Sequence, residues 1–373
     1  MPARRYRGLL AIVVFLIAYG SLYPFQFIAV PNYQGFLTMP LGRGGVADVA
    51  LNIFLYAPLG FLAFHSLRTG GRGRRVAVAA IAGTLMSATI EVLQVFDVTR
   101  DSSLSDILSN GTGSLAGAVF ASAVPRFVSS RGLARLRGVA LRPAFLAAFW
   151  VLFQLYPLLP EISHAALARS ATAFAHWSSF EALLFATDWL TALVLLREAL
   201  PAVRRGLAPL LVFLMPVKLI LFERHLTSSE LAGALAGLAV FAVFGRSRSF
   251  ATRVLPALLI ALLAARELLP FRFGPPAEFI WIPFGASLSS QDADSLLVLF
   301  RKAFVYGSAI WFVQEARGRV WSVTLSISFL LFVLEWFQRW IPGRTPEVTD
   351  ALMAVLMGAV LALSSGEPRE ALN

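Results

Sequence analysis

The sequence of 373 residues contains no cysteine, which excludes a disulfide framework, a thiol nucleophile and a thiolate metal site. Charged residues are also scarce, at 14% of the chain, whereas hydrophobic residues make up 58% and the mean hydropathy is +0.73. This composition is too apolar for a soluble domain and predicts a polytopic membrane protein. The 4 histidines have no metal-ligand spacing, so the sequence predicts no metal site, and it also predicts no cofactor.

Acidic residues are fewer than basic ones, and the net charge is +11. The arginines lie in short runs between apolar segments rather than on one basic face, which argues against a nucleic-acid partner. Their distribution instead favours a bacterial inner-membrane protein with both termini in the cytoplasm. Arg4, Arg5 and Arg7 precede an apolar run that ends near Phe27 and lacks a small-residue cleavage site, so we expect an uncleaved first helix.

Apolar segments of about 20 residues recur along the chain, and each is long enough to span a bilayer. They predict an all-α protein of about twelve transmembrane helices, at 8–27, 47–66, 76–96, 104–124, 142–160, 178–197, 207–224, 229–245, 253–270, 297–315, 320–340 and 347–364. The longer segments 28–46, 158–177 and 272–296 are expected to lie along the membrane surface, because they are rich in aromatic residues and proline.

Similar segments recur at a nearly constant interval, which predicts three repeats of four helices. A proline that ends the first helix is followed at almost the same distance by a glutamate; the pairs are Pro24 and Glu91, Pro157 and Glu223, and Pro270 and Glu335. The predicted units are residues 1–128, 139–246 and 250–365. In the last helix of each unit, small residues spaced by four predict close helix contacts: Gly113 with Gly117, Gly233 with Gly237, and Ala354 with Gly358.

The first unit contains a polar cluster between two apolar segments. Its candidate ligand-binding residues are Asn52, Glu91, Gln94, Arg100, Asp106 and Asn110. Glu91 and Gln94 share one helix face, and Asp106 and Asn110 share the face of the next helix. The same order and spacing return in a candidate second site of Glu335, Gln338, Arg344 and Asp350, with Lys302 in the place of Asn52. In the membrane orientation given above, the first cluster faces the outer side.

Asn52 leads an apolar stretch with Pro58-Leu59-Gly60-Phe61, and the cluster is followed by Gly113 and Gly117. This pattern resembles the VanZ-like family of bacterial membrane proteins, which is named after a teicoplanin-resistance protein. Residues 1 to about 126 carry the full signature, the third unit carries part of it, and the second unit is degenerate. The resemblance implies a role in the cell envelope and in antibiotic resistance, but no particular reaction.

Three functions are compatible with these residues. The first is binding of a lipid-linked or lipid-tailed anionic ligand at the outer leaflet, such as a lipid-linked envelope precursor or a lipoglycopeptide, with Arg100 holding the anion. The second is an enzyme that acts on a lipid or polyprenyl-linked headgroup, with Glu91 and Asp106 as acid and base. The third is a transporter in which Asp188 relays protons, although Asp188 could also pair with a neighbouring helix, for example through Lys218. Catalytic residues and oligomeric state stay open.

Overall fold

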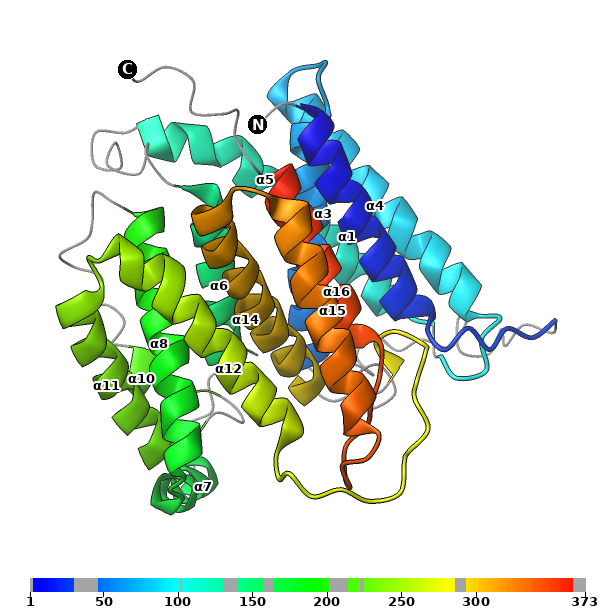
Figure 1. Cartoon of the computed structure of the whole chain (residues 1–373). Coiled ribbons are helices and arrows are strands. Elements are labelled where there is room, and N and C mark those ends of the chain that lie inside the picture. Colours follow the sequence, from blue (N-terminus) through cyan, green and yellow to red (C-terminus); the bar gives the residue numbers. More distant parts are fainter. Residues whose placement is uncertain are drawn as a thin grey trace. The chain divides into compact units, whose positions relative to one another are not determined.

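The computed structural model describes residues 3–29, 46–100, 102–129, 140–156, 164–200, 214–219, 221, 225–285 and 293–364. The named secondary-structure elements in these residues are all helices, which confirms the predicted all-α class. The chain divides into two compact units, Met1–Arg137 and Gly138–Ser365 (Figure 1). Their boundary falls between the first two predicted repeats, whereas the boundary predicted between residues 246 and 250 lies inside the second unit.

In the residues that the structure describes, the N-terminal unit contains helices at the places of its four predicted spans. These are α1 (Ala3–Leu22), α3 (Val46–Ser66), α4 (Arg72–Gln94) and α5 (Leu104–Ser129). Helix α3 packs against each of the others, and α4 also packs against α5 (Figure 1). The polar loop between α4 and α5 therefore lies at one end of this bundle, beside the C-terminal end of α1.

The C-terminal unit is larger. Its helices are α6 (Leu141–Leu155), α7 (His164–Ala175), α8 (Ser179–Ala199), α10 (Leu214–Lys218), α11 (Ser228–Phe244), the π-helix η3 (Phe250–Val254), α12 (Leu255–Leu268), α14 (Ala293–Arg317), α15 (Val320–Gln338) and α16 (Thr349–Leu363). Helix α14 contacts α6, α12, α15 and α16, so it lies at the centre of this unit (Figure 1). Its residues Phe304, Tyr306 and Phe312 are almost completely buried.

Within the described residues, 6 helices are long and apolar enough to cross a membrane: α1, α3, α4, α8, α14 and α15. Helices α6, α11 and α16 are apolar but shorter. The chain is thus a multi-pass membrane protein, while the number of twelve spans and the threefold repeat stay predictions. In the predicted span 207–224 the structure describes α10, and Glu223 lies outside the described residues.

Glycines bring α5 into direct contact with α3, as the predicted helix contact requires. A Cβ atom on Gly113 would lie 2.4 Å from the carbonyl oxygen of Ile53, and one on Gly117 would lie 1.9 Å from that of Ala57. Gly233 and Gly237 likewise bring α11 close to α8, where a Cβ atom would lie 2.5 and 2.7 Å from the carbonyl oxygens of Ala182 and Ala186. Gly358 differs, because its close neighbour is the side chain of Thr324 on α15. Small residues are how membrane helices approach each other closely.

We expect Gly117→Ala to destabilise the protein by about 1–3 kcal/mol, because the added methyl group would meet the backbone of α3 rather than a movable side chain. Thermal unfolding of the purified protein in a neutral detergent measures this loss. Gly73→Ala is the matched control, since a Cβ atom there would meet nothing within 4 Å. Equal stability of the two variants would contradict the close contact between α3 and α5.

Candidate functional site

Glu91 lies near the C-terminal end of α4 and is only 3% exposed. Its Oε2 atom accepts a hydrogen bond of 2.6 Å from the backbone N–H of Ser103, immediately before α5 begins. The first N–H groups of a helix have no partner within the helix, and the helix dipole favours a negative charge there. Glu91 therefore joins the end of one helix to the start of the next.

Asp106 and Asn110 reach the other helices of the bundle from α5. Asn52 on α3 donates a hydrogen bond of 2.9 Å from Nδ2 to Asp106 Oδ1, and Asn110 Nδ2 donates one of 2.9 Å to Ser87 Oγ on α4. Tyr56, one turn after Asn52, lies close to Ser87, Glu91 and Asp106. The Oδ1 atom of Asn110 is buried and makes no hydrogen bond with the residues that the structure describes. Four of the predicted residues thus converge.

Arg100 and Gln94 have a different environment, because they bind the C-terminal end of α1. Arg100 donates hydrogen bonds to the carbonyl oxygens of Tyr23 (2.8 Å) and Gly20 (3.2 Å), and Gln94 donates one of 2.8 Å to that of Ser21. The last carbonyl groups of a helix need such partners, and the helix dipole favours a cation there. In this structure the predicted anion-binding arginine is a helix cap.

Asp97 belongs to the same loop, although it was not among the candidate residues predicted from the sequence. Its Oδ1 accepts hydrogen bonds from the N–H and the hydroxyl of Thr99, at 2.9 and 2.7 Å, and its Oδ2 accepts one of 3.1 Å from the N–H of Gln26. Burial alone would raise the pKa of Asp97, but these hydrogen bonds and the nearby charge of Arg100 outweigh it and lower the pKa. Asp97 thus ties the segment after α1 to the loop after α4.

At the centre of the predicted second site, an ion pair takes the place of the hydrogen bond between Asn52 and Asp106. Lys302 on α14 forms an ion pair with Asp350 Oδ1 on α16, and the hydroxyl of Tyr306 donates a hydrogen bond of 2.6 Å to Asp350 Oδ2. Glu335 Oε2 on α15 accepts a hydrogen bond of 3.1 Å from the backbone N–H of Glu347. Lys302 and Asp350 correspond to Asn52 and Asp106, and Glu335 binds a backbone N–H twelve residues later, as Glu91 does.

Arg344 and Gln338 repeat the contacts of Arg100 and Gln94. Arg344 donates hydrogen bonds to the carbonyl oxygens of Arg266 and Leu269, at the end of α12. Gln338 Nε2 donates one of 2.9 Å to Glu267 Oε2. In both units an arginine from a loop holds the last carbonyl groups of an earlier helix, and a glutamine lies beside it.

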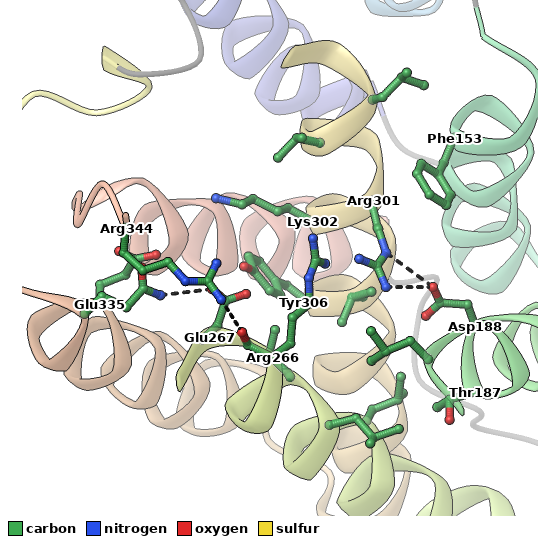
Figure 2. A pocket seen from close by; sticks show the side chains of 18 of the residues that line it. Phe153, Thr187, Asp188, Arg266, Glu267, Arg301, Lys302, Tyr306, Glu335 and Arg344 are labelled. Carbon is green, nitrogen blue, oxygen red and sulfur yellow. Dashed lines mark hydrogen bonds and ion pairs between the residues drawn. The ribbon is translucent and has the colours of Figure 1, made fainter. Parts of the chain in front are cut away.

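A cavity of about 640 Å³ opens next to this second cluster, within the C-terminal unit (Figure 2). Lys302, Glu335, Gln338 and Arg344 line it, whereas Asp350 is not part of the lining. Its other charged lining residues are Asp188, Arg266, Glu267, Arg301 and Glu347, and its apolar lining includes Phe153, Leu184, Leu259, Leu262, Leu263, Leu297, Val298 and Val305. The cavity therefore offers both an apolar wall and a set of charges.

Asp188 is one of these charges, and its suggested pairing with Lys218 is wrong. Asp188 on α8 accepts hydrogen bonds from Arg301 on α14, at 3.3 Å from Nε and 3.2 Å from Nη2 (Figure 2). Lys218 instead binds Glu230 at 2.6 Å and Gln154 at 2.9 Å. Asp188 is therefore paired with a residue of a neighbouring helix, which was the alternative to a role in proton relay.

Three carboxylates meet in this region. Glu267, Glu335 and Asp350 each offer an oxygen atom, and these atoms lie within 4.8 Å of one another. Carboxylate oxygens suit hard divalent cations. The ammonium group of Lys302 already binds Asp350, however, and its positive charge repels a second cation at the same place. The donor set therefore does not favour a metal ion.

Comparison with family models gives one match. Residues 8–125 match the model of the VanZ/LLP1 family. The N-terminal unit belongs to the VanZ-like family. This VanZ-like unit contains α1, α3 and α4 with most of α5, and it includes Asn52, Glu91, Gln94, Arg100, Asp106 and Asn110. Comparisons with curated proteins and with solved structures found no match.

Several residues of the two clusters were missed from the sequence, although it held signals for some of them. Tyr56 and Tyr306 each lie four residues after the polar residue that leads the second helix of its predicted unit, on the same helix face. Glu267 lies three residues before Pro270, in the place of Ser21 before Pro24. No local pattern marks Arg266, Arg301 or Asp97. Their contacts are with segments that are distant in sequence, so they form only when the helices pack together.

We expect Asp97→Asn to destabilise the protein at neutral pH. Because the folded pKa of Asp97 is lowered, its charge adds stability above the ordinary value of 3.8, and this stability is lost as the pH falls through the folded pKa. Unfolding measured across pH should show a difference from wild type that shrinks below pH 3.8. Thr99→Ser keeps the hydroxyl donor and should behave like wild type. A constant difference at all pH values would contradict this role.

Lys302→Met should destabilise the protein by about 3–5 kcal/mol, because it removes the cationic partner of a buried carboxylate. Lys302→Asn should cost less, since it rebuilds the amide–carboxylate pairing that Asn52 and Asp106 make in the VanZ-like unit. Thermal unfolding in a neutral detergent compares the two variants. If both variants lost the same stability, an asparagine at position 302 would not pair with Asp350 as Asn52 pairs with Asp106, and the predicted correspondence would be contradicted.

Proposed function

We propose that this VanZ-like membrane protein binds a lipid-linked or lipid-tailed molecule with an anionic headgroup, and that this binding lowers susceptibility to antibiotics that act on the cell envelope. The site lies between helices in the inner membrane and opens toward the outer leaflet, with both termini in the cytoplasm. The ligand is a lipid-linked envelope precursor or a lipoglycopeptide.

The cavity of the C-terminal unit is the observation that carries this proposal. Its wall combines a stripe of aliphatic side chains on α12 with the basic residues Arg266, Arg301, Lys302 and Arg344 (Figure 2). A volume of about 640 Å³ lies in the ordinary range for small-molecule sites. The apolar wall ends at these four basic residues and at four acidic ones, Asp188, Glu267, Glu335 and Glu347. Arg266 binds none of these acids directly, which leaves a cation for a molecule with an apolar tail and an anionic head.

The likeness between the two polar clusters supports a common origin for the two units. Both have an arginine on the last carbonyl groups of an earlier helix, a glutamate on a backbone N–H twelve residues later, and a polar pair between a lysine or asparagine and an aspartate. We therefore place a second VanZ-like unit at residues 250–365. The cluster at Glu91 is then a related ligand site, with the buried Oδ1 atom of Asn110 as a ready acceptor.

An enzyme is the second candidate, because Glu91 and Asp106 lie close enough to interact electrostatically. As acid and base they would act on a lipid-linked headgroup. Release of inorganic phosphate from decyl phosphate by the purified protein, lost in Glu91→Gln, would support this candidate. Clear binding without turnover would count against it.

We expect the protein, purified in a neutral maltoside detergent, to bind decyl phosphate more tightly than decanol, because the two share a tail and differ in charge. Leu259→Trp should weaken this binding by about tenfold or more, since the indole would fill the apolar end of the cavity. A tenfold loss of affinity corresponds to about 1.4 kcal/mol of binding free energy. Isothermal titration calorimetry measures both.

Leu235→Trp is the control, because Leu235 is 59% exposed and does not line the cavity. Cells that express each variant are then compared for growth in a lipoglycopeptide. The proposal predicts protection by wild type and by Leu235→Trp, and none by Leu259→Trp at equal protein level. If decyl phosphate and decanol bound equally to wild type, the anionic-headgroup proposal would be overturned.

A further inference from the structure

Arg266 is a charged residue of the cavity whose side chain has no direct binding partner among the described residues. It lies on the same face of α12 as Leu259, Leu262 and Leu263, and all four side chains line the cavity. Its guanidinium group makes no hydrogen bond or ion pair with the described part of the chain. A charge taken partly out of water needs compensation, and here Glu267 and Asp188 supply it only electrostatically, without a direct hydrogen bond or ion pair. Arg266 is therefore positioned to receive an anion from outside the protein.

Arg301 stands close to Arg266, and the two cations repel each other. Arg301 is held by Asp188, but loosely for an ion pair, because its two hydrogen bonds of 3.3 and 3.2 Å reach the same oxygen atom. Charge-assisted hydrogen bonds are usually about 2.7–2.9 Å long, and an arginine fork usually binds two oxygen atoms. The contact between Arg301 and Asp188 is thus weaker than the geometry of arginine allows.

The other basic lining residues are already engaged. Lys302 binds Asp350, and Arg344 binds the carbonyl groups at the end of α12. The acids that act electrostatically on Arg266 are Glu267 and Asp188, and Glu267 accepts a hydrogen bond from Gln338. Figure 2 shows Arg266 between the group that contains Glu267 and the ion pair of Arg301 with Asp188.

We infer that Arg266 and Arg301 form an anion subsite, and that Asp188 acts as an internal counter-ion that an incoming anionic headgroup displaces from Arg301. The inference rests on the proposed function and names the residues that hold the headgroup. A phosphate or carboxylate group bridges the two guanidinium groups, and its apolar tail lies along Leu263, Leu262 and Leu259 on α12. When the subsite empties, Asp188 neutralises Arg301 again.

The experiment measures binding of decyl phosphate by calorimetry, and thermal unfolding without ligand, in a neutral maltoside detergent. Arg266→Gln should weaken binding by about tenfold or more, while the unfolding temperature stays equal or rises. A purely structural arginine would instead lose stability and leave affinity unchanged. Arg253→Gln, an exposed position outside the cavity, is the control and should change neither quantity.

Asp188→Asn supplies the second test, because it removes the charge that competes with the ligand. It should tighten binding of decyl phosphate by about tenfold. Its unfolding temperature should fall without ligand and recover when decyl phosphate is added, as mass action requires. The double variant Asp188→Asn with Arg301→Gln, which keeps the net charge, should bind weakly. Unchanged affinity in Arg266→Gln and Asp188→Asn would overturn the subsite.

The outcomes separate this inference from the proposed function. If Leu259→Trp weakens binding but Arg266→Gln and Asp188→Asn do not change it, the cavity binds the amphiphile and the subsite is overturned. Inorganic phosphate distinguishes a free anion from a headgroup, and we expect it to bind at least tenfold more weakly than decyl phosphate. Equal affinity that Arg266→Gln abolishes would retain the subsite and overturn the lipid-tailed ligand.

Discussion

The carbonyl groups at the end of a membrane helix set the constraint on which both clusters depend. They need hydrogen-bond donors, and within a bilayer water does not supply them freely. At the ends of α1 and α12 an arginine from a distant loop, Arg100 or Arg344, donates to two of these groups. This contact fixes the loop after α4 or α15 against the earlier helix. The glutamate before each loop and the aspartate after it are thereby held at defined places.

The two units satisfy similar constraints with different chemistry. In the VanZ-like unit, the amide of Asn52 and the carboxylate of Asp106 form a hydrogen bond that adds no positive charge. In the C-terminal unit, Lys302 adds a positive charge, and Tyr306 and two further acids surround Asp350. The change coincides with a cavity lined by Arg266 and Arg301. The cluster of the VanZ-like unit is thus mainly internal, whereas that of the C-terminal unit faces an open volume.

The sequence was sufficient to predict those parts that depend on local pattern. Hydropathy predicted twelve membrane spans, of which the described residues contain 6 helices that are long and apolar enough. The repeated order Glu, Gln, Arg and Asp predicted two clusters, and their contacts are found to correspond. The sequence could not show that Arg100 binds carbonyl groups of α1. Every residue has a backbone carbonyl group, so the residue types do not indicate which of these groups accepts a hydrogen bond. Nor could the sequence pair Asp188 with Arg301, since helices distant in sequence meet only through packing. The cavity could not be predicted either, because its lining residues come from helices that are distant in sequence.

The close contact of α3 with α5 also bears on how the VanZ-like unit can move. Gly60 and Gly117 leave no side-chain layer between the two backbones, since a Cβ atom on either would lie 1.9 Å from a carbonyl oxygen of the opposite helix. Interiors packed this tightly do not deform gradually. The two helices therefore shift as one rigid body. Helix α4 is held close to that body as well, since a Cβ atom on Gly83 would lie 1.9 Å from the hydroxyl oxygen of Ser114 on α5, so any movement that opens the polar cluster falls to α1.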